Sequence, residues 1–521
     1  MTLTEKPPVN PWILALIVSI ATFMEVLDTT ITNVSLTHIA GALGADQDQS
    51  TWILTSYLVS NGIVLPLSGW LSDYMGQKKF FLLCIAGFTL ASFMCGAATS
   101  LGVLIFFRLI QGLAGGGLQP TQQAIILDLF PPEKRGAVFG ITGITLILAP
   151  IIGPTLGGWI TDNFDWRWIF FINIPVGITL FMLISTLLPE SVTSNKKGKI
   201  DFIGMGLLAL GLGALQIVLD KGQQEDWFSS PFILTLSIVS ISALVGAVVW
   251  MLKIKDPIVD LRLLKIKSFS VSWLLIFFVG FALYGTTAIL PLLLQSQFGY
   301  DATLAGLVLS PGGVVIVVLM MLTGRLISKV SVRNLVMFGF CLVAYGMYYS
   351  MTHIAPNMDY NGFVMVRVVQ VMGIPFLFIP VSAAAFMYVP REKNNKASAL
   401  FALSRNLGGS FGIALVSTYL TRQQQSIQAN MVRNLNPASP IYQGAVQKLT
   451  LFFQGQVGSA ETAGRMALGR LYQELLRQSS FVAYAHVFEF LAILMIFGVA
   501  LAWFLPTIPA AGGGAAAAAA H

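Results

Sequence analysis

Apolar stretches of roughly 20 residues recur along almost the whole chain, and each is long enough to cross a hydrocarbon layer about 30 Å thick as a helix. Short segments that contain charged residues, Pro or Gly separate these stretches. Hydrophobic residues make up 55% of the chain and charged residues only 10%, which excludes a soluble surface of ordinary polarity. The sequence therefore predicts an all-α polytopic membrane protein.

Fourteen transmembrane helices are expected. The first is expected to be retained, because it is too long for the core of a signal peptide, lacks a cleavage pattern of small residues and contains Glu25 and Asp28. The predicted spans are residues 12–34, 51–71, 80–98, 101–125, 137–160, 167–188, 202–219, 232–252, 270–295, 303–325, 334–352, 361–388, 397–420 and 482–505.

Basic residues fall in alternate connections between the spans, and this pattern predicts the orientation. The intervening short connections contain only Arg167 and Lys221. By the positive-inside rule the basic connections are cytoplasmic, together with the N-terminus and Lys6, and an even number of spans returns the C-terminus there. The basic connections contain Lys78, Lys79, Lys134, Arg135, Lys196, Lys197, Lys199, Lys253, Lys255, Arg262, Lys265, Lys267, Arg325, Lys329, Arg333, Arg391, Lys393 and Lys396. The net charge of +7 reflects this topology, and no nucleic-acid partner is expected.

An internal repeat divides the chain. The segment 130–134, which reads FPPEK, reappears 259 residues later as VPREK, and the same offset pairs Arg108 and Gln111 with Arg367 and Gln370. Two six-helix halves related as parallel repeats are therefore expected, with a transport pathway at their interface. The predicted units are an N-terminal half (1–195), an inserted two-helix segment (196–262), a C-terminal half (263–505) and a low-complexity cytoplasmic tail (506–521).

Residues 421–481 are too polar to cross a membrane. We expect an extracytoplasmic loop that is partly helical, because apolar and helix-forming residues lie between Tyr442 and Leu476. Such a loop either binds a partner or is a solvated insertion without one.

Three charged side chains are predicted to lie deep in the membrane in the first half. Glu25 and Asp28 are three residues apart, so both carboxylates belong to one face of the first helix. Two close carboxylates in a medium of low dielectric constant cannot both ionise easily, so one is expected to hold a proton. Arg108 needs a carboxylate, backbone carbonyls or water as partners. The alternatives are hydrogen bonds to neighbouring helices for the carboxylates and a structural strut for the arginine.

Five segments in order resemble signatures of one family. They are the loop Gly69-Trp-Leu-Ser-Asp73-Tyr-Met-Gly76-Gln-Lys78-Lys79, the fourth-span Arg108-Leu-Ile-Gln111-Gly112, the fifth-span Gly153-Pro154-Thr-Leu-Gly157-Gly158, the first-span Leu27-Asp28-Thr-Thr-Ile-Thr-Asn33-Val34 and the sixth-span Trp166-Arg-Trp168-Ile-Phe-Phe-Ile-Asn173. Together they resemble the fourteen-span, EmrB-like drug:proton antiporters of the major facilitator superfamily. The departures are Gln77 where Arg is usual, Ser35 where Ala is usual and Glu25 where Gln is frequent.

This resemblance implies a major facilitator fold and a proton-coupled antiporter that exports hydrophobic or amphipathic drugs across the bacterial inner membrane. It implies a role for Arg108 in proton coupling beside Asp28 and Glu25, and no cofactor other than the proton gradient. It also implies a periplasmic adaptor of the EmrA type with an outer-membrane channel as partners. The alternative is a narrow-specificity exporter of a metabolite such as a fatty acid or a siderophore.

The signature residues also have physical roles of their own. Gly153, Pro154, Gly157 and Gly158 permit close packing and a bend of the fifth span, which would seal the pathway, although such glycines are also common in ordinary membrane packing. Asp73 can latch one conformation by pairing with basic groups or a helix N-terminus, unless it is merely an exposed turn residue. The other residues of this conformational set are Gly69, Gly76, Lys78 and Lys79.

A pathway lined by aromatic side chains, Met and a few carboxylates would suit lipophilic, often cationic compounds. The candidate lining residues are Phe23, Asn33, Trp52, Tyr57, Gln119 and Gln123. An enzyme is not expected, because the four histidines have no metal-ligand spacing and no phosphate-binding loop of the G-x-x-x-x-G-K-S/T type is present. No metal site is expected either.

Overall fold

A computed structural model describes residues 9–190, 201–436, 438–457 and 459–506, and these residues form helices and connections without any strand. Lys6, Lys196, Lys197, Lys199 and the predicted tail beyond residue 506 lie outside them. The α-helices are α1 (Pro11–Leu43), α2 (Gln47–Ser50), α3 (Trp52–Met75), α4 (Gln77–Gly96), α5 (Leu101–Gly115), α6 (Leu118–Leu129), α7 (Pro132–Asn163), α8 (Trp168–Phe171), α9 (Asn173–Leu187), α10 (Phe202–Lys221), α11 (Pro231–Lys253), α12 (Lys267–Phe298), α13 (Ala302–Leu326), α14 (Val332–His353), α15 (Tyr360–Val371), α16 (Ile374–Ala385), α17 (Asn394–Asn434), α18 (Pro440–Val457) and α19 (Ala460–Ala502). The all-α prediction is confirmed for the described residues.

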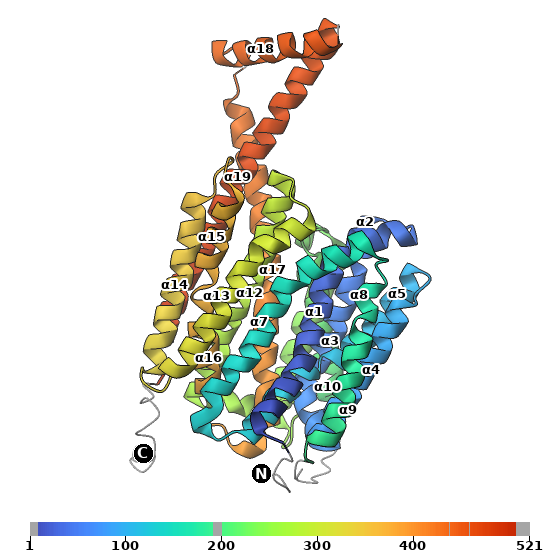
Figure 1. Cartoon of the computed structure of the whole chain (residues 1–521), viewed down its shortest axis with the longest axis vertical. Coiled ribbons are helices and arrows are strands. Elements are labelled where there is room, and N and C mark those ends of the chain that lie inside the picture. The colour runs from blue at the N-terminus through green and yellow to red at the C-terminus, as the bar shows by residue number, and fades with distance from the viewer. Residues whose placement is uncertain (1–8, 191–200, 437, 458, 507–521) are drawn as a thin grey trace.

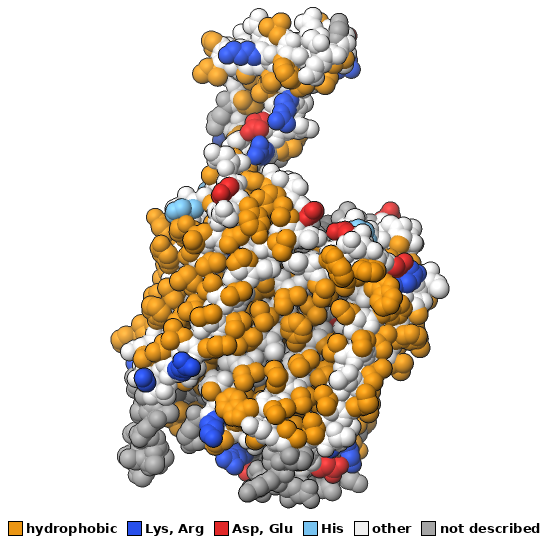
Figure 2. Space-filling view, in the orientation of Figure 1, with side chains coloured by type: hydrophobic (Ala, Val, Ile, Leu, Met, Phe, Trp, Pro, Cys, Tyr) orange, Lys and Arg blue, Asp and Glu red, His pale blue; other side chains and the backbone are white. Residues whose placement is uncertain are grey.

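Thirteen helical segments in the described part of the chain are long and apolar enough to cross a membrane. The predicted span that is not among them corresponds to α3, which has 24 residues and packs against α5 and α17 inside the bundle. Its Ser56, Ser60 and Asn61 are buried, so these polar side chains face protein rather than lipid. On the face seen in Figure 2, apolar side chains cover most of the middle of the bundle.

The two last predicted spans are parts of much longer helices. α17 continues to Asn434 and α19 begins already at Ala460, and with α18 they form a protrusion at one end of the bundle (Figure 1). We call residues 421–481 the hairpin and the opposite end of the bundle the basal end. Gln428 donates a hydrogen bond to Tyr472, which joins the two long helices beyond the bundle. Hydropathy indicates only the part of a helix that contacts lipid. The predicted spans are therefore shorter than α17 and α19, which continue as helices beyond the lipid-contacting part.

The fourth span of each half is broken at glycine. Gly116 separates α5 from α6, and Gly373 separates α15 from α16. A Cβ at Gly116 would lie 2.5 Å from the carbonyl oxygen of Asn61, and one at Gly373 would lie 2.4 Å from that of Gly339. Both positions therefore need glycine, because another backbone passes too closely for any side chain.

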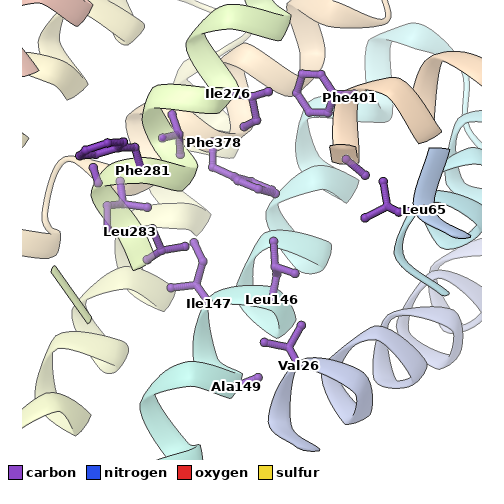
Figure 3. Packing of buried hydrophobic residues seen from close by; sticks show 14 of the residues in the cluster. Val26, Leu65, Leu146, Ile147, Ala149, Ile276, Phe281, Leu283, Phe378 and Phe401 are labelled. Carbon is purple, nitrogen blue, oxygen red and sulfur yellow. The ribbon is translucent and has the colours of Figure 1, made fainter. Parts of the chain in front are cut away.

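The halves meet along several pairs of helices, including α17 with α6 and α16 with α7. α7 of the first half packs on α13, and α3 packs on α17. α10 from the inserted pair lies on α3 and also touches α17. Side chains of both halves mix in the core between them, as Val26 and Leu146 do with Phe378 and Phe401 in Figure 3.

Candidate functional site

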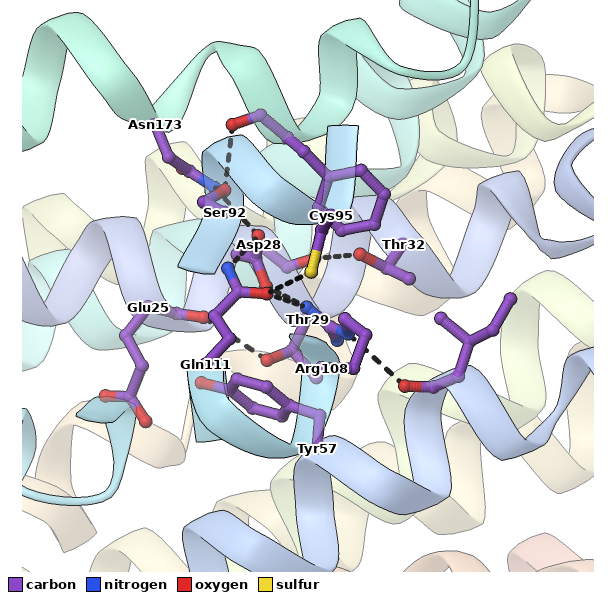
Figure 4. Close-up of polar contacts among 12 residues, drawn as sticks. Glu25, Asp28, Thr29, Thr32, Tyr57, Ser92, Cys95, Arg108, Gln111 and Asn173 are labelled. Atoms are coloured by element: carbon purple, nitrogen blue, oxygen red, sulfur yellow. Dashed lines mark hydrogen bonds and ion pairs between the residues drawn. The ribbon is translucent and has the colours of Figure 1, made fainter. Parts of the chain in front are cut away.

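A buried ion pair joins α1 to α5. Arg108 Nη1 lies 2.5 Å from Asp28 Oδ2, and both side chains are 0% exposed (Figure 4). Arg108 also donates from Nε to the carbonyl oxygen of Ile53 at 3.2 Å and from Nη1 to Gln111 Oε1 at 2.8 Å. The Tyr57 ring covers the guanidinium, 4.3 Å from its carbon. A charge at this depth is stable only with such partners.

The second oxygen of Asp28 is also occupied. Oδ1 accepts hydrogen bonds from Gln111 Nε2 at 3.0 Å and from Asn173 Nδ2 at 2.7 Å, and Asn173 also donates to Ser92 Oγ. The network therefore holds α1, α4, α5 and α9 together. Loss of the negative charge on Asp28 would weaken its charge-assisted bonds and leave Arg108 buried without a counter-charge.

Glu25 has different neighbours from Asp28. Its Oε1 accepts from Asn61 Nδ2 of α3 at 2.9 Å, and its Oε2 is buried without a hydrogen bond. In Figure 4 its carboxyl group points away from the Asp28 network. The two carboxylates of α1 therefore have separate hydrogen-bond partners.

A small cavity, with room for about one water molecule, lies between the halves. It is lined by Thr22 of α1, Gln119, Gln122 and Gln123 of α6, Thr142 and Leu146 of α7, Phe378 of α16 and Arg405 of α17. Two of the predicted pathway residues, Gln119 and Gln123, are therefore in the lining. The other four are not: Tyr57 covers Arg108, Phe23 is half-buried, Asn33 is exposed, and Trp52 lies beside Lys221 in a second pocket.

The glycines of the fifth span allow α7 to pack closely against α1 of the first half and α13 of the second half. A Cβ at Gly153 would lie 2.1 Å from Thr30 Oγ1, and one at Gly157 would lie 3.2 Å from the Ile31 backbone, both on α1. A Cβ at Gly158 would lie 2.8 Å from Thr303 Oγ1 on α13. Pro154 lies inside the same helix. No path for a solute fits between backbones at these distances.

A cluster at the basal end joins α3, α4 and α6 to the start of α17. We call it the latch, and it consists of Asp73, Gln77, Asp128, Asn394 and Asn395. Asn395 Nδ2 donates to Asp73, Asn394 Nδ2 donates to Asp128 at 3.0 Å, and Gln77 Nε2 donates to Asp128 at 2.9 Å and to Asn395 at 2.7 Å. Both carboxylates thus lie at the N-terminus of α17, where negative charge is favourable.

The remaining loop residues surround the latch. A Cβ at Gly69 would lie 2.8 Å from the carbonyl oxygen of Asn395, so α3 and α17 touch through their backbones. Gly76 joins α3 to α4 with a φ of +90°. Lys78 is half-buried and Lys79 is exposed in the first turn of α4. The two halves are therefore in contact at the basal end in this structure.

The repeat places a second arginine in an equivalent position but without a carboxylate. Arg367 Nη2 donates to Thr287 Oγ1 at 3.0 Å, and Thr287 follows Asp28 by the same 259 residues. The Nε and Nη1 of Arg367 are buried without hydrogen bonds. Of the two copies, only the first therefore contains an ion pair.

Several network residues were not predicted as site residues. Gln111 and Asn173 stand inside the quoted signatures, and Gln77 was noted only as a departure from one. Asp128 and the Asn394-Asn395 pair carried a weaker signal, namely polar residues at the ends of predicted spans.

Comparison with known proteins agrees with this architecture. The family model described as Major Facilitator Superfamily matches residues 18–413. The chain belongs to this superfamily. It is 37% identical to the multidrug export protein EmrB of Escherichia coli over 96% of each chain. It is 35% identical to the fatty acid resistance protein FarB of Neisseria gonorrhoeae over 98% of this chain and 99% of the relative.

The fold is also that of a solved structure, a double-tryptophan mutant of XylE. The comparison of the two structures gives a TM-score of 0.60 and 14% sequence identity, and it covers 96% of each chain. Family and fold together make the protein a multi-pass secondary transporter of a bacterial membrane and not an enzyme.

Proposed function

We propose that the protein exports hydrophobic or amphipathic compounds across the inner membrane in exchange for protons, with both termini in the cytoplasm. The observation that carries the proposal is the Asp28–Arg108 network, a fully buried ion pair inside one half of a two-half transporter. Intramembrane carboxylates in such settings bind and release protons. The relative whose name describes multidrug export supports the direction of transport.

The proton and the substrate act at separate places in this proposal. Asp28 lies within the first half, whereas the cavity lies between the halves. Protonation of Asp28 repacks α1 and α5, and α1 carries both Thr22 at the cavity and the contact of Thr30 with α7. The latch and the α7 contacts then open or close as the halves rock.

A second candidate is a narrow exporter of a fatty acid or another metabolite such as a siderophore. The similarity to a relative named for fatty acid resistance favours the first of these. A transport panel that contains both cationic dyes and fatty acids separates a broad exporter from a narrow one.

The hairpin is proposed to dock a periplasmic adaptor of the EmrA type, which would connect to an outer-membrane channel. It protrudes from the bundle, and the α18 side chains Ile441, Leu451 and Phe452 are 85%, 63% and 61% exposed. Apolar side chains exposed on a polar protrusion are typical of an interaction surface. Crosslinking to a co-expressed adaptor that is lost on deletion of the hairpin would support this, and unchanged export without the hairpin would contradict it.

The central test is substrate-triggered proton release from proteoliposomes under an imposed pH gradient. The wild type is compared with Asp28→Asn and Glu25→Gln, and with Asp256→Asn as a control because Asp256 is exposed in a connection. We expect release from the wild type and the control and none from Asp28→Asn. Release by Asp28→Asn at the wild-type rate would exclude Asp28 as the proton carrier, and no release by the wild type across the panel would exclude proton-coupled multidrug export.

A further inference from the structure

We infer that the connection between α11 and α12 binds the phosphate head groups of anionic lipids, and that lipid bound there stabilises the latch. We call residues 254–266 the strap. Three features support this site: the level of the strap at the ends of two spanning helices, its exposed lysines, and its bonds to the start of α17. The site does not depend on the substrate or on protons.

The strap lies where the bundle meets the membrane surface at the basal end. α11 ends at Lys253 and α12 begins at Lys267, and both helices are long and apolar enough to cross a membrane. Trp250, in the last turn of α11, donates from its indole nitrogen to Asp201 at 2.8 Å. A tryptophan with a polar partner at a helix end is typical of the boundary between lipid and water. The strap is therefore at the level of the lipid head groups.

The strap is folded against the bundle through its apolar side. Ile258 and Leu263 are 1% and 2% exposed. Arg262 donates to the carbonyl oxygens of Ile254 at 2.9 Å and of Lys255 at 3.1 Å, which closes the strap on itself. A ligand that binds the strap therefore acts on an ordered segment.

The other side of the strap is basic. Four lysines on the strap and directly beside it are exposed, and within the described part of the chain none of them forms an ion pair or donates a side-chain hydrogen bond. They are Lys253, Lys255, Lys265 and Lys267. The one exposed acid among residues 253–267 is Asp256. Lysine clusters next to a spanning helix attract anionic lipid, and each lysine adds about a fivefold gain in affinity.

The strap is bonded to the start of α17 on both sides of the latch asparagines. Lys393 Nζ lies 2.7 Å from Asp260 Oδ2, and Lys396 Nζ donates to the carbonyl oxygen of Pro257 at 3.2 Å. The two residues between these lysines are the latch asparagines, which donate to the first half. A head group that holds the strap at the membrane surface therefore also holds the latch closed.

Cysteine labelling in lipid nanodiscs tests the inference on the whole protein. Cys341 is exposed and is replaced by Ser, while Cys84 and Cys95 are buried and stay. Ser72→Cys is the probe, because Ser72 is 1% exposed and precedes the latch residue Asp73. We expect this cysteine to react with an uncharged maleimide only when the basal end opens.

The labelling rate is compared between nanodiscs of phosphatidylcholine and nanodiscs that also contain phosphatidylglycerol. We expect phosphatidylglycerol to slow labelling at least about fivefold at low salt. The effect should disappear near 1 M salt, where the screening length is about 3 Å.

Two double variants separate the strap from basic residues in general. Lys255→Gln with Lys265→Gln should remove most of the protection by phosphatidylglycerol. Arg325→Gln with Lys329→Gln is the matched control and should keep it. Both control residues are exposed in the α13–α14 connection at the same end, and among the described residues neither side chain forms a hydrogen bond or an ion pair.

Equal labelling of the wild type in the two lipid mixtures would overturn the inference, and so would equal protection of the wild type and the strap variant. An equal effect of inorganic phosphate in phosphatidylcholine nanodiscs would also overturn it, since the site would then take a soluble anion. The comparison of lipids needs no variant. Proton-coupled export can fail its own test without changing this result, because the labelling assay contains neither substrate nor an imposed pH gradient.

Discussion

Replacing Gly153 by Ala would place a methyl group inside the contact between α7 and α1. The new Cβ would lie 2.1 Å from Thr30 Oγ1 and 2.6 Å from Thr30 Cβ. Rotation of the threonine side chain can move the hydroxyl but not its Cβ. The two helices must therefore separate by about 1 Å to reach ordinary contact, and overpacking of this kind costs about 1–3 kcal/mol.

Gly140→Ala is the matched control, because Gly140 lies on the same helix. Its Cβ would meet Ile379 Cδ1 at 3.5 Å, which is an ordinary contact. Alanine also favours the helix by roughly 0.5–1 kcal/mol over glycine, so this variant should be neutral or slightly stabilised. The two variants make the same chemical change and differ only in the space available.

Thermal denaturation of the detergent-solubilised protein, followed by size-exclusion fluorescence, measures the difference. We expect a lower apparent Tm for Gly153→Ala and an unchanged or higher one for Gly140→Ala. Proteoliposomes containing Gly153→Ala should also leak protons faster in the absence of substrate. Equal Tm values for the two variants would refute the claim that α7 packs tightly against Thr30 of α1 at Gly153.

Three further variants probe the other sites. Arg108→Leu leaves the carboxylate of Asp28 buried without its cation, so we expect a loss of about 3–5 kcal/mol of stability, seen as a lower Tm and no transport. Thr287→Asp gives Arg367 a carboxylate, and a raised Tm at neutral pH that falls on acidification would show the new ion pair. Asn395→Ala removes latch hydrogen bonds at the basal end, so labelling of a cysteine placed in the cavity should become faster from that side, and unchanged labelling would count against the latch.

The sequence predicts the architecture well because a segment that crosses lipid must be apolar and must satisfy its own backbone hydrogen bonds. Blocks of about 20 apolar residues must be helices, and the repeat at 259 residues reveals two halves before any coordinate is known. The sequence does not predict the full lengths of α17 and α19, because hydropathy does not reveal how far a helix continues into water. The span predicted at 51–71 corresponds to α3, whose hydropathy is lower than that of the other spans because its buried serine and asparagine side chains face protein and not lipid.

The candidate site is only partly predictable, for a related reason. Deep charges such as Asp28 and Arg108 stand out in an apolar chain, but spacing along a helix says nothing about which neighbour each side chain meets. Glu25 and Asp28 share a helix and still bind different partners. Gln77 was noted as a departure from a signature, whereas in the structure it donates two hydrogen bonds in the latch.

The unbroken length of α17 has a mechanical consequence. Its 41 residues extend for about 60 Å, from the latch at Asn394, past Arg405 at the cavity, to the hairpin beyond the bundle. A rod of this kind acts as a lever, so a small tilt at the cavity is magnified at its far end. Release of the latch, a shift at the cavity and a swing of the hairpin are then one movement, and a partner bound at the tip of the hairpin would be moved in each transport cycle.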